Sequence, residues 1–179
     1  MELQEILSTK ISEADVRIIA RKALKDKGLL DTVFNLVFHP DEKINNRASW
    51  ILGHICDLDL SVMKNRDRKI LGLLKSEEGL KGGRTRNILR IYNTRTVPES
   101  CSSDVLDTCY RFLKDPSYAI AIRAFSITVI YNISKPYPEL LEELKLVLND
   151  LLKHDEAPAI INRGYHTLEK IEKMNRKKS

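Results

Sequence analysis

The sequence predicts an all-α protein: a right-handed α-α superhelix of about four helical pairs, preceded by an N-terminal capping helix. Three observations lead to this prediction. An apolar pattern with helical spacing recurs four times, prolines and glycines separate the recurrences, and aromatic residues make up only 6% of the chain, which argues against a β-sandwich. The 179 residues, 42% of them hydrophobic and 31% charged, suit one domain or one short repeat array.

The first expected element is a capping helix within residues 1–27. Ser12 stands three residues before Asp15, and this spacing of a hydroxyl and an acid is typical of a helix start. Apolar residues at helical spacing follow from Val16 to Leu24. A terminal repeat would leave its apolar flank in water without such a helix, so we expect this segment to cover the first pair.

Four segments share a pattern that begins with an arginine. They are residues 47–55, 84–92, 123–131 and 163–171. In each, a small residue follows the arginine and mostly apolar residues stand at offsets four, five and eight, which lie on one face of an α-helix. The arginines are 37, 39 and 40 residues apart, a spacing typical of helical-pair repeats. Each segment is therefore expected to be the second helix of a pair.

The first helix of each pair is expected upstream, where an apolar stretch ends in a polar turn. Proline follows in three of these turns, at Pro40, Pro116 and Pro158. The second turn has Gly79, Gly82 and Gly83 instead and is expected to be the most flexible. The expected pairs span residues 29–58, 61–95, 103–133 and 138–174, and together with the cap they form a single domain over residues 1–179.

These features resemble the HEAT and armadillo-like families of helical repeats over about residues 29–171. The resemblance rests on the repeated arginine, the small residue after it and the Ile/Leu face, in a helix that follows a turn with proline. It implies that the second helices line the inner surface of the array. It also implies binding of proteins or, less often, of nucleic acid.

The repeated arginines have two interpretations. In the structural one, their side chains donate hydrogen bonds to carbonyls or acids of neighbouring pairs, with their stems over apolar surface. In the functional one, they form a line of cations for an acidic ligand. The structural interpretation is favoured, and Arg84 fits both because its surroundings are basic. These four residues are Arg47, Arg84, Arg123 and Arg163.

A basic segment, residues 64–95, carries ten lysines and arginines and three acidic residues, a net charge of +7 in a chain whose total is +5. Arg86 and Arg90 are four residues apart and are expected to project from the same side of a helix. This segment is compatible with a solvated surface. It is also compatible with a site for phosphates, nucleic acid or an acidic protein patch.

Offsets three and seven in the second helices are expected to point away from the core. They include Trp50, His54, Asn87 and His166, residue types that suit a recognition surface. The alternative is that they are buried against neighbouring helices, with Trp50 under the capping helix. The remaining members of this stripe are Ile91, Ser126, Ile130 and Lys170.

The sequence contains no pattern typical of a catalytic or metal site. Its four histidines form no HExxH arrangement and its cysteines form no CxxC, so no metal or cofactor is expected. The three cysteines are widely spaced and odd in number, which favours a reducing compartment. Without a signal peptide or a long apolar run, we expect a cytoplasmic protein with no membrane association.

We therefore expect a non-catalytic scaffold that binds a protein partner. The alternative is a nucleic-acid-binding module that uses residues 64–95. A less favoured possibility is an enzyme similar to the HEAT-like alkylpurine DNA glycosylases, which needs an aromatic cleft and a carboxylate; Trp50 is the only tryptophan, and Asp57 is the nearest acid. The candidate binding residues are Trp50, His54, Arg84, Arg86, Asn87, Arg90 and His166.

Overall fold

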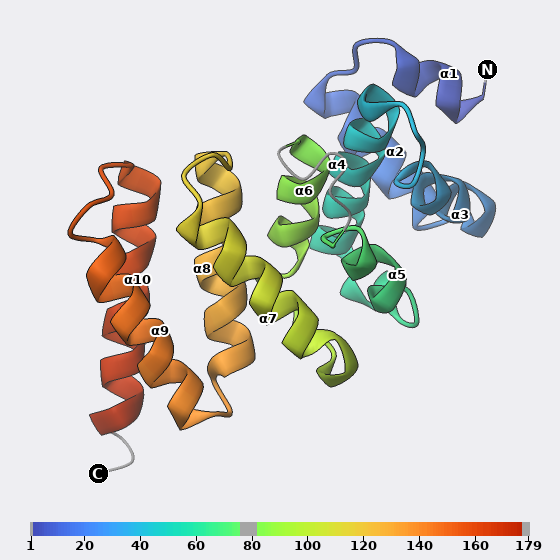
Figure 1. Ribbon diagram of the computed structural model, residues 1–179. Helices are drawn as coiled ribbons and strands as arrows, with labels where there is room; N and C mark the ends of the chain where they lie inside the picture. The colour runs from blue at the N-terminus through green and yellow to red at the C-terminus, as the bar shows by residue number, and fades with distance from the viewer. Residues whose placement is uncertain (1, 76–81, 177–179) are drawn as a thin grey trace. The chain divides into compact units, whose positions relative to one another are not determined.

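The computed structural model describes residues 2–75 and 82–176, and every regular element in these ranges is a helix (Figure 1). The turn expected to be flexible around Gly79 lies outside the described residues. The chain divides into two compact units, which we call unit 1 (Met1–Ile91) and unit 2 (Tyr92–Ser179). The organisation into a single domain with four pairs stays a prediction, and each unit is described by itself.

Unit 1 is built around the long helix α4. Its described helices are α1 (Leu3–Ser8), α2 (Glu13–Ala23), α3 (Lys27–Leu36), α4 (Glu42–Leu58), the 3-10 helix η1 (Leu60–Met63), α5 (Asp67–Gly72) and α6 (Gly83–Ile91). Helix α4 packs against α1, α2, α3, η1 and α6. Ile51 and Ile55, one turn apart on α4, have no exposed surface and form the centre of the core.

The N-terminal segment expected to hold one capping helix contains two helices, α1 and α2. The start of α2 is the expected capping box, because the Asp15 amide donates to Ser12 Oγ while the Ser12 amide donates to the Asp15 carboxylate. Thr9, in extended conformation, ends α1. Leu7 of α1 is fully buried, so this short helix is also part of the core.

The described part of unit 2 (residues 92–176) consists of four helices, of which α8 is central. The helices are α7 (Glu99–Lys114), α8 (Ile120–Ser134), α9 (Pro138–Leu151) and α10 (Pro158–Arg176). Helix α8 packs against each of the other three. Arg123 is its one charged residue, which fits a helix covered on several sides. Proline is the first residue of α9 and of α10, where a missing amide hydrogen does no harm.

The cysteines Cys56, Cys101 and Cys109 are all described and buried, and none forms a disulfide. Burial raises the pKa of the Cys109 thiol to about 12, against a hydrogen bond with Ser126 that lowers it. Among the described residues, no helix combines the length and the apolar character needed to cross a membrane.

Candidate functional site

The repeated arginines of unit 1 bind the carbonyls at the ends of earlier helices. Arg47 Nη1 donates to the carbonyl of Leu7, in the last turn of α1, at 2.6 Å. Arg84 Nη1 lies 3.4 Å from the carbonyl of Val37, which caps the C-terminus of α3. The last carbonyls of a helix have no partner within it and carry its negative dipole end, so a guanidinium stabilises them.

The repeated arginines of unit 2 differ from each other. Arg123 Nε donates to the Leu113 carbonyl in the last turn of α7 at 3.2 Å, and its Nη2 forms an ion pair with Asp155. Both side chains of this pair are at least nine-tenths buried. Arg163 instead donates from Nη1 to two neutral side-chain oxygens, Oδ1 of Asn93 and Oγ1 of Thr128, at 3.1 and 3.0 Å.

Three of the candidate residues, Trp50, His54 and Arg90, form a cluster with Asp57 between α4 and α6 in unit 1. The rings of Trp50 and His54 are 6.2 Å apart between centroids. His54 Nδ1 lies 3.9 Å from Asp57 Oδ2, which also forms an ion pair with Arg90 of α6. A Cβ on Gly53 would lie 2.9 Å from Arg90 Nη1, so the missing side chain lets the guanidinium lie against α4. Trp50 and His54 are only partly exposed.

Partial burial and the charge of Arg90 lower the pKa of His54, although Asp57 acts in the opposite direction. Arg17 and Glu13 of α2 act more weakly and with opposite signs. His54 therefore favours its neutral form more strongly than a solvated imidazole does.

Asn87 is 3% exposed and connects α6 to α4. Its Nδ2 donates to the Asn46 carbonyl at 3.2 Å and to Ser49 Oγ at 3.1 Å, and its Oδ1 accepts from Arg86 Nη2 at 3.3 Å. The expectation that the stripe points away from the core is wrong for Asn87 and for three other positions. The second helices pack against each other, α4 against α6 and α8 against α10, and cover these side chains. The other three positions are Ile91, Ser126 and Ile130.

Several cations of the basic segment have partners within unit 1. Arg66 Nη2 forms an ion pair with Asp31 of α3 at 2.5 Å. Lys69 Nζ lies 5.6 and 4.6 Å from the ring centroids of Phe34 and Phe38. With the contacts of Arg84 and Arg90, at least four of the described cations of the segment contact residues outside it, and two of these, Arg66 and Arg90, pair with carboxylates.

His166 lies on α10 of unit 2 and is exposed. It lines a cavity of about 570 Å³ between α8 and α10, together with Arg163 and Lys170. The structure thus brings Trp50, His54 and Arg90 together in unit 1, and it groups His166 with different cations.

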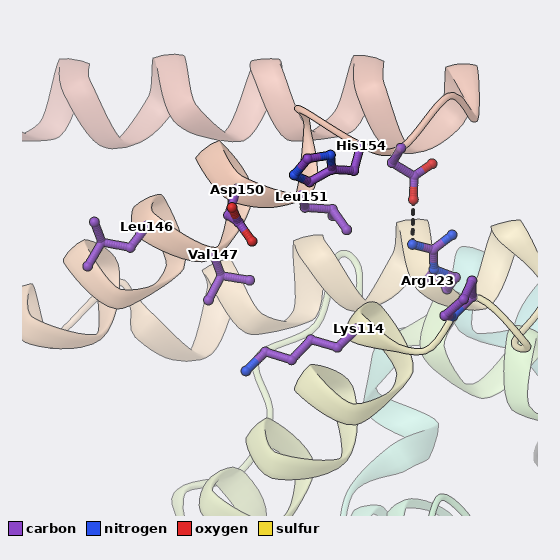
Figure 2. A pocket seen from close by; sticks show the side chains of 9 residues that line it. Lys114, Arg123, Leu146, Val147, Asp150, Leu151 and His154 are labelled. Atoms are coloured by element: carbon purple, nitrogen blue, oxygen red, sulfur yellow. Dashed lines mark hydrogen bonds and ion pairs between the residues drawn. The ribbon is translucent and has the colours of Figure 1, made fainter.

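Unit 2 also contains a groove of about 630 Å³, which we call the α7/α9 groove (Figure 2). Helices α7 and α9 both pack on α8 but not closely on each other, and the groove lies between them. Figure 2 shows Lys114 of α7 across from Val147 of α9, and the ion pair of Arg123 at one end. The residues that line the groove are Lys114, Pro116, Arg123, Leu146, Val147, Asp150, Leu151, His154 and Asp155.

Leu146 is the most exposed large apolar residue of the described chain, at 72%. The buried face of α9 consists of Leu141, Leu144 and Leu148, at helical spacing. Leu146 lies off that face, and this is the signal by which sequence reasoning could have found the groove. The rest of the groove has no local signal in the sequence, because Lys114 of α7, on its other wall, stands 32 residues before Leu146.

The amino-acid sequence matches a family model described as the HEAT repeat domain over residues 3–171. The chain belongs to the HEAT repeat domain family. The resemblance predicted from the repeated arginines is confirmed, and so is the all-α helical-repeat fold of this HEAT domain. Neither the curated proteins nor the solved structures contain a significant match.

Family membership makes this HEAT domain a helical-repeat scaffold, a class that often mediates protein interactions. In the described part of the chain, no group of three or more His, Cys, Asp or Glu side chains is arranged to hold a metal ion. The candidate binding residues named from the sequence stay predictions.

Proposed function

We propose that this HEAT domain is a non-catalytic scaffold that binds a segment of a partner protein in the α7/α9 groove. The observation that carries the proposal is an open groove of about 630 Å³ in which Leu146 is 72% exposed. Single exposed leucines are common, but here Leu146 adjoins Val147 and Leu151 in one concave surface. Full burial of a leucine is worth about 1.5–3 kcal/mol, so a partner that covers Leu146 gains binding energy there.

The charges of the groove indicate the chemistry of the segment. Lys114 stands on the α7 side, and Asp150 stands on the α9 side (Figure 2). A complementary segment therefore carries an apolar side chain for Leu146 and Val147, an acidic residue that faces Lys114 and a basic residue that faces Asp150. Location in the cytoplasm is part of this proposal and is supported by three buried cysteines without disulfides.

The test is selection of peptides from a displayed random library on the full chain, followed by fluorescence anisotropy of the selected peptides. We expect enrichment of peptides with a large aliphatic residue beside an acidic one. Leu146→Asp should weaken their binding by about tenfold or more, because it places a charge where an apolar contact forms. Leu58→Asp is the matched control, since Leu58 of α4 is 55% exposed and lies outside the groove.

A charge exchange then tests the orientation of the peptide. Lys114→Glu should weaken a peptide that carries the acidic residue, and replacing that acidic residue with lysine should restore binding. The proposal is wrong if no peptide is enriched, or if Leu146→Asp and Leu58→Asp have equal effects.

A further inference from the structure

The cavity between α8 and α10, which we call the α8/α10 pocket, has no acidic residue among the described residues that line it. It has a volume of about 570 Å³ and shares no lining residue with the α7/α9 groove. Its two charged side chains are Arg163 and Lys170, and His166 adds an imidazole ring; all three lie on α10. Thr128 and Tyr131 of α8 form the opposite wall; the Thr128 hydroxyl accepts from Arg163 Nη1, and the Tyr131 hydroxyl donates to Met174 Sδ. The pocket therefore combines positive charge with neutral hydrogen-bonding groups.

Arg163 has donors left over within this pocket. The Arg163 guanidinium makes two hydrogen bonds, and Nη1 donates both of them, to Asn93 and Thr128. The Nε and Nη2 atoms donate to no acceptor among the described residues. The guanidinium carbon lies 5.0 Å from the centroid of the Phe125 ring, which limits its movement. Partial burial lowers the pKa of Arg163, and no carboxylate counteracts this effect. A guanidinium with two nitrogens available is suited to bidentate binding of an oxyanion.

Two further ammonium groups lie close to one ring of the same pocket. Lys170 Nζ lies 5.8 Å and Lys135 Nζ 5.0 Å from the centroid of the Tyr131 ring. Neither lysine, nor His166, forms an ion pair with a residue that the structure describes. Lys170 lines the pocket, so its ammonium group is placed to attract an anion there.

We propose that the α8/α10 pocket binds the phosphoryl group of a phosphorylated side chain in a protein segment. A phosphoryl group carries about two negative charges and three acceptor oxygens, which match the fork of Arg163 and the single donors of Lys170 and His166. A carboxylate has one charge and fewer acceptor oxygens, so it uses fewer of these donors.

The charge of unit 2 favours a phosphorylated protein over a nucleic acid. Residues 92–176 contain eleven lysines and arginines and twelve acidic residues, so the cations of the pocket are a local exception. Binding of a nucleic-acid chain requires a basic surface that follows several phosphates. One pocket with two cations and an imidazole instead suits one phosphoryl group.

The test uses the full chain labelled with nitrogen-15 and the peptide acetyl-Gly-Ala-phosphoserine-Ala-Gly-amide as the probe. We expect chemical-shift changes in the amides of α10 around His166 and Lys170, and displacement of the peptide by inorganic phosphate. The same peptide with serine should cause no such changes. The peptide with glutamate should bind about tenfold more weakly, because charge-assisted hydrogen bonds are lost.

Variants on α10 distinguish binding in the pocket from a general attraction to the positive charge of the helix. Lys170→Glu should raise the dissociation constant of the phosphopeptide about tenfold or more, because it replaces a binding cation with an anion. Lys173→Glu is the matched control, since Lys173 is exposed on the same helix and does not line the pocket. Its effect should stay within about twofold, as expected for an exposed charge that salt screens. Arg163→Lys should weaken binding while it retains the charge, because lysine lacks the fork.

Three results would overturn the proposal: equal effects of Lys170→Glu and Lys173→Glu, equal binding of the glutamate and phosphoserine peptides, or tighter binding of single-stranded oligothymidylate at the same amides. Leu146→Asp in the α7/α9 groove should leave phosphopeptide binding unchanged. Failure at this pocket is therefore separable from failure of the proposed groove.

Discussion

The part of the basic segment that lies in unit 1 and the α8/α10 pocket of unit 2 use their cations in different ways. In unit 1, Arg66 and Arg90 form ion pairs with Asp31 and Asp57, residues that precede the segment in sequence. In unit 2, Arg163 has only neutral acceptors, although residues 92–176 contain slightly more acids than bases.

This difference shows that the local net charge of a sequence does not indicate where cations are available. A helical repeat brings residues about 35 to 40 positions apart into contact, so an acid in one pair neutralises an arginine in the next. The separation in sequence is 35 residues for Arg66 and Asp31 and 33 for Arg90 and Asp57. Whether a cation is free to bind a ligand therefore depends on how the helices pack, not on the sequence around it.

The largest expected effect separates the two repeated arginines of unit 2. Arg123→Met leaves the carboxylate of Asp155 buried without its ion-pair partner, and we expect a loss of about 3–5 kcal/mol in the free energy of unfolding. Arg163→Met leaves only neutral oxygens, for which we expect about 1–2 kcal/mol. Urea denaturation of the full chain measures both. Equal losses would show that Arg163 contributes as much to stability as Arg123, and the two arginines would then not differ in role.

The next largest expected effect on stability comes from substitutions of two glycines, one in each unit. A Cβ on Gly164 would lie 3.0–3.3 Å from three atoms of the Leu152 side chain, so Gly164→Val should cost about 1–3 kcal/mol through overpacking. A Cβ on Gly53 meets only the end of the Arg90 side chain, which can move. Gly53→Ala should therefore be neutral or should stabilise the chain by up to about 1 kcal/mol, because alanine favours helix. Thermal unfolding of both variants checks this, and a strongly destabilised Gly53→Ala contradicts it.

A smaller effect concerns the pH dependence of unit 1. The pKa of His54 is lower in the folded chain than its ordinary value of 6.5, so the unfolded chain binds more protons near pH 6. Neutral His54 therefore contributes fully to the free energy of unfolding above pH 6.5, and this contribution is lost as the pH falls below 6.5. His54→Gln should reduce this dependence in melts at pH 5.5 and 7.5, values chosen about one unit either side of the histidine pKa. Arg90→Met should raise the His54 pKa in an NMR titration; an unchanged pKa would contradict the assigned cause.

The smallest expected effect is on nucleic-acid binding by the basic segment. Arg90 has an acidic partner and Arg86 contacts Asn87, so these two cations are less able to replace counterions. We expect weak binding of duplex DNA at physiological salt and little change in Arg86→Glu/Arg90→Glu, measured by fluorescence anisotropy. Tight, steeply salt-dependent binding that the double variant abolishes would reverse the comparison and favour the nucleic-acid alternative.

The repeat period and the helical class could be predicted from sequence because both are local patterns. The repeat period follows from the spacing of four arginines: Arg47, Arg84, Arg123 and Arg163. The family match confirms the class of helical-repeat fold. The acceptor of each arginine could not be predicted, because helix-end carbonyls carry no signal in the side-chain sequence. The burial of Asn87 could not be predicted for a related reason: the pattern of its own helix α6 does not show that α4 packs on it, with partners of Asn87 that stand 41 and 38 residues earlier. The α7/α9 groove needs two separate helices and has no single motif.

The rate at which the buried cysteines react with a thiol reagent reports how often the surrounding helices open. Only a thiolate reacts quickly with a maleimide, and burial with a pKa of about 12 keeps Cys109 in its inert thiol form. Labelling therefore requires the surrounding helices to open. Cys56 lies in unit 1 and Cys101 and Cys109 in unit 2, so mass spectrometry of the labelled peptides in native buffer would time the opening of each unit separately, without an engineered probe.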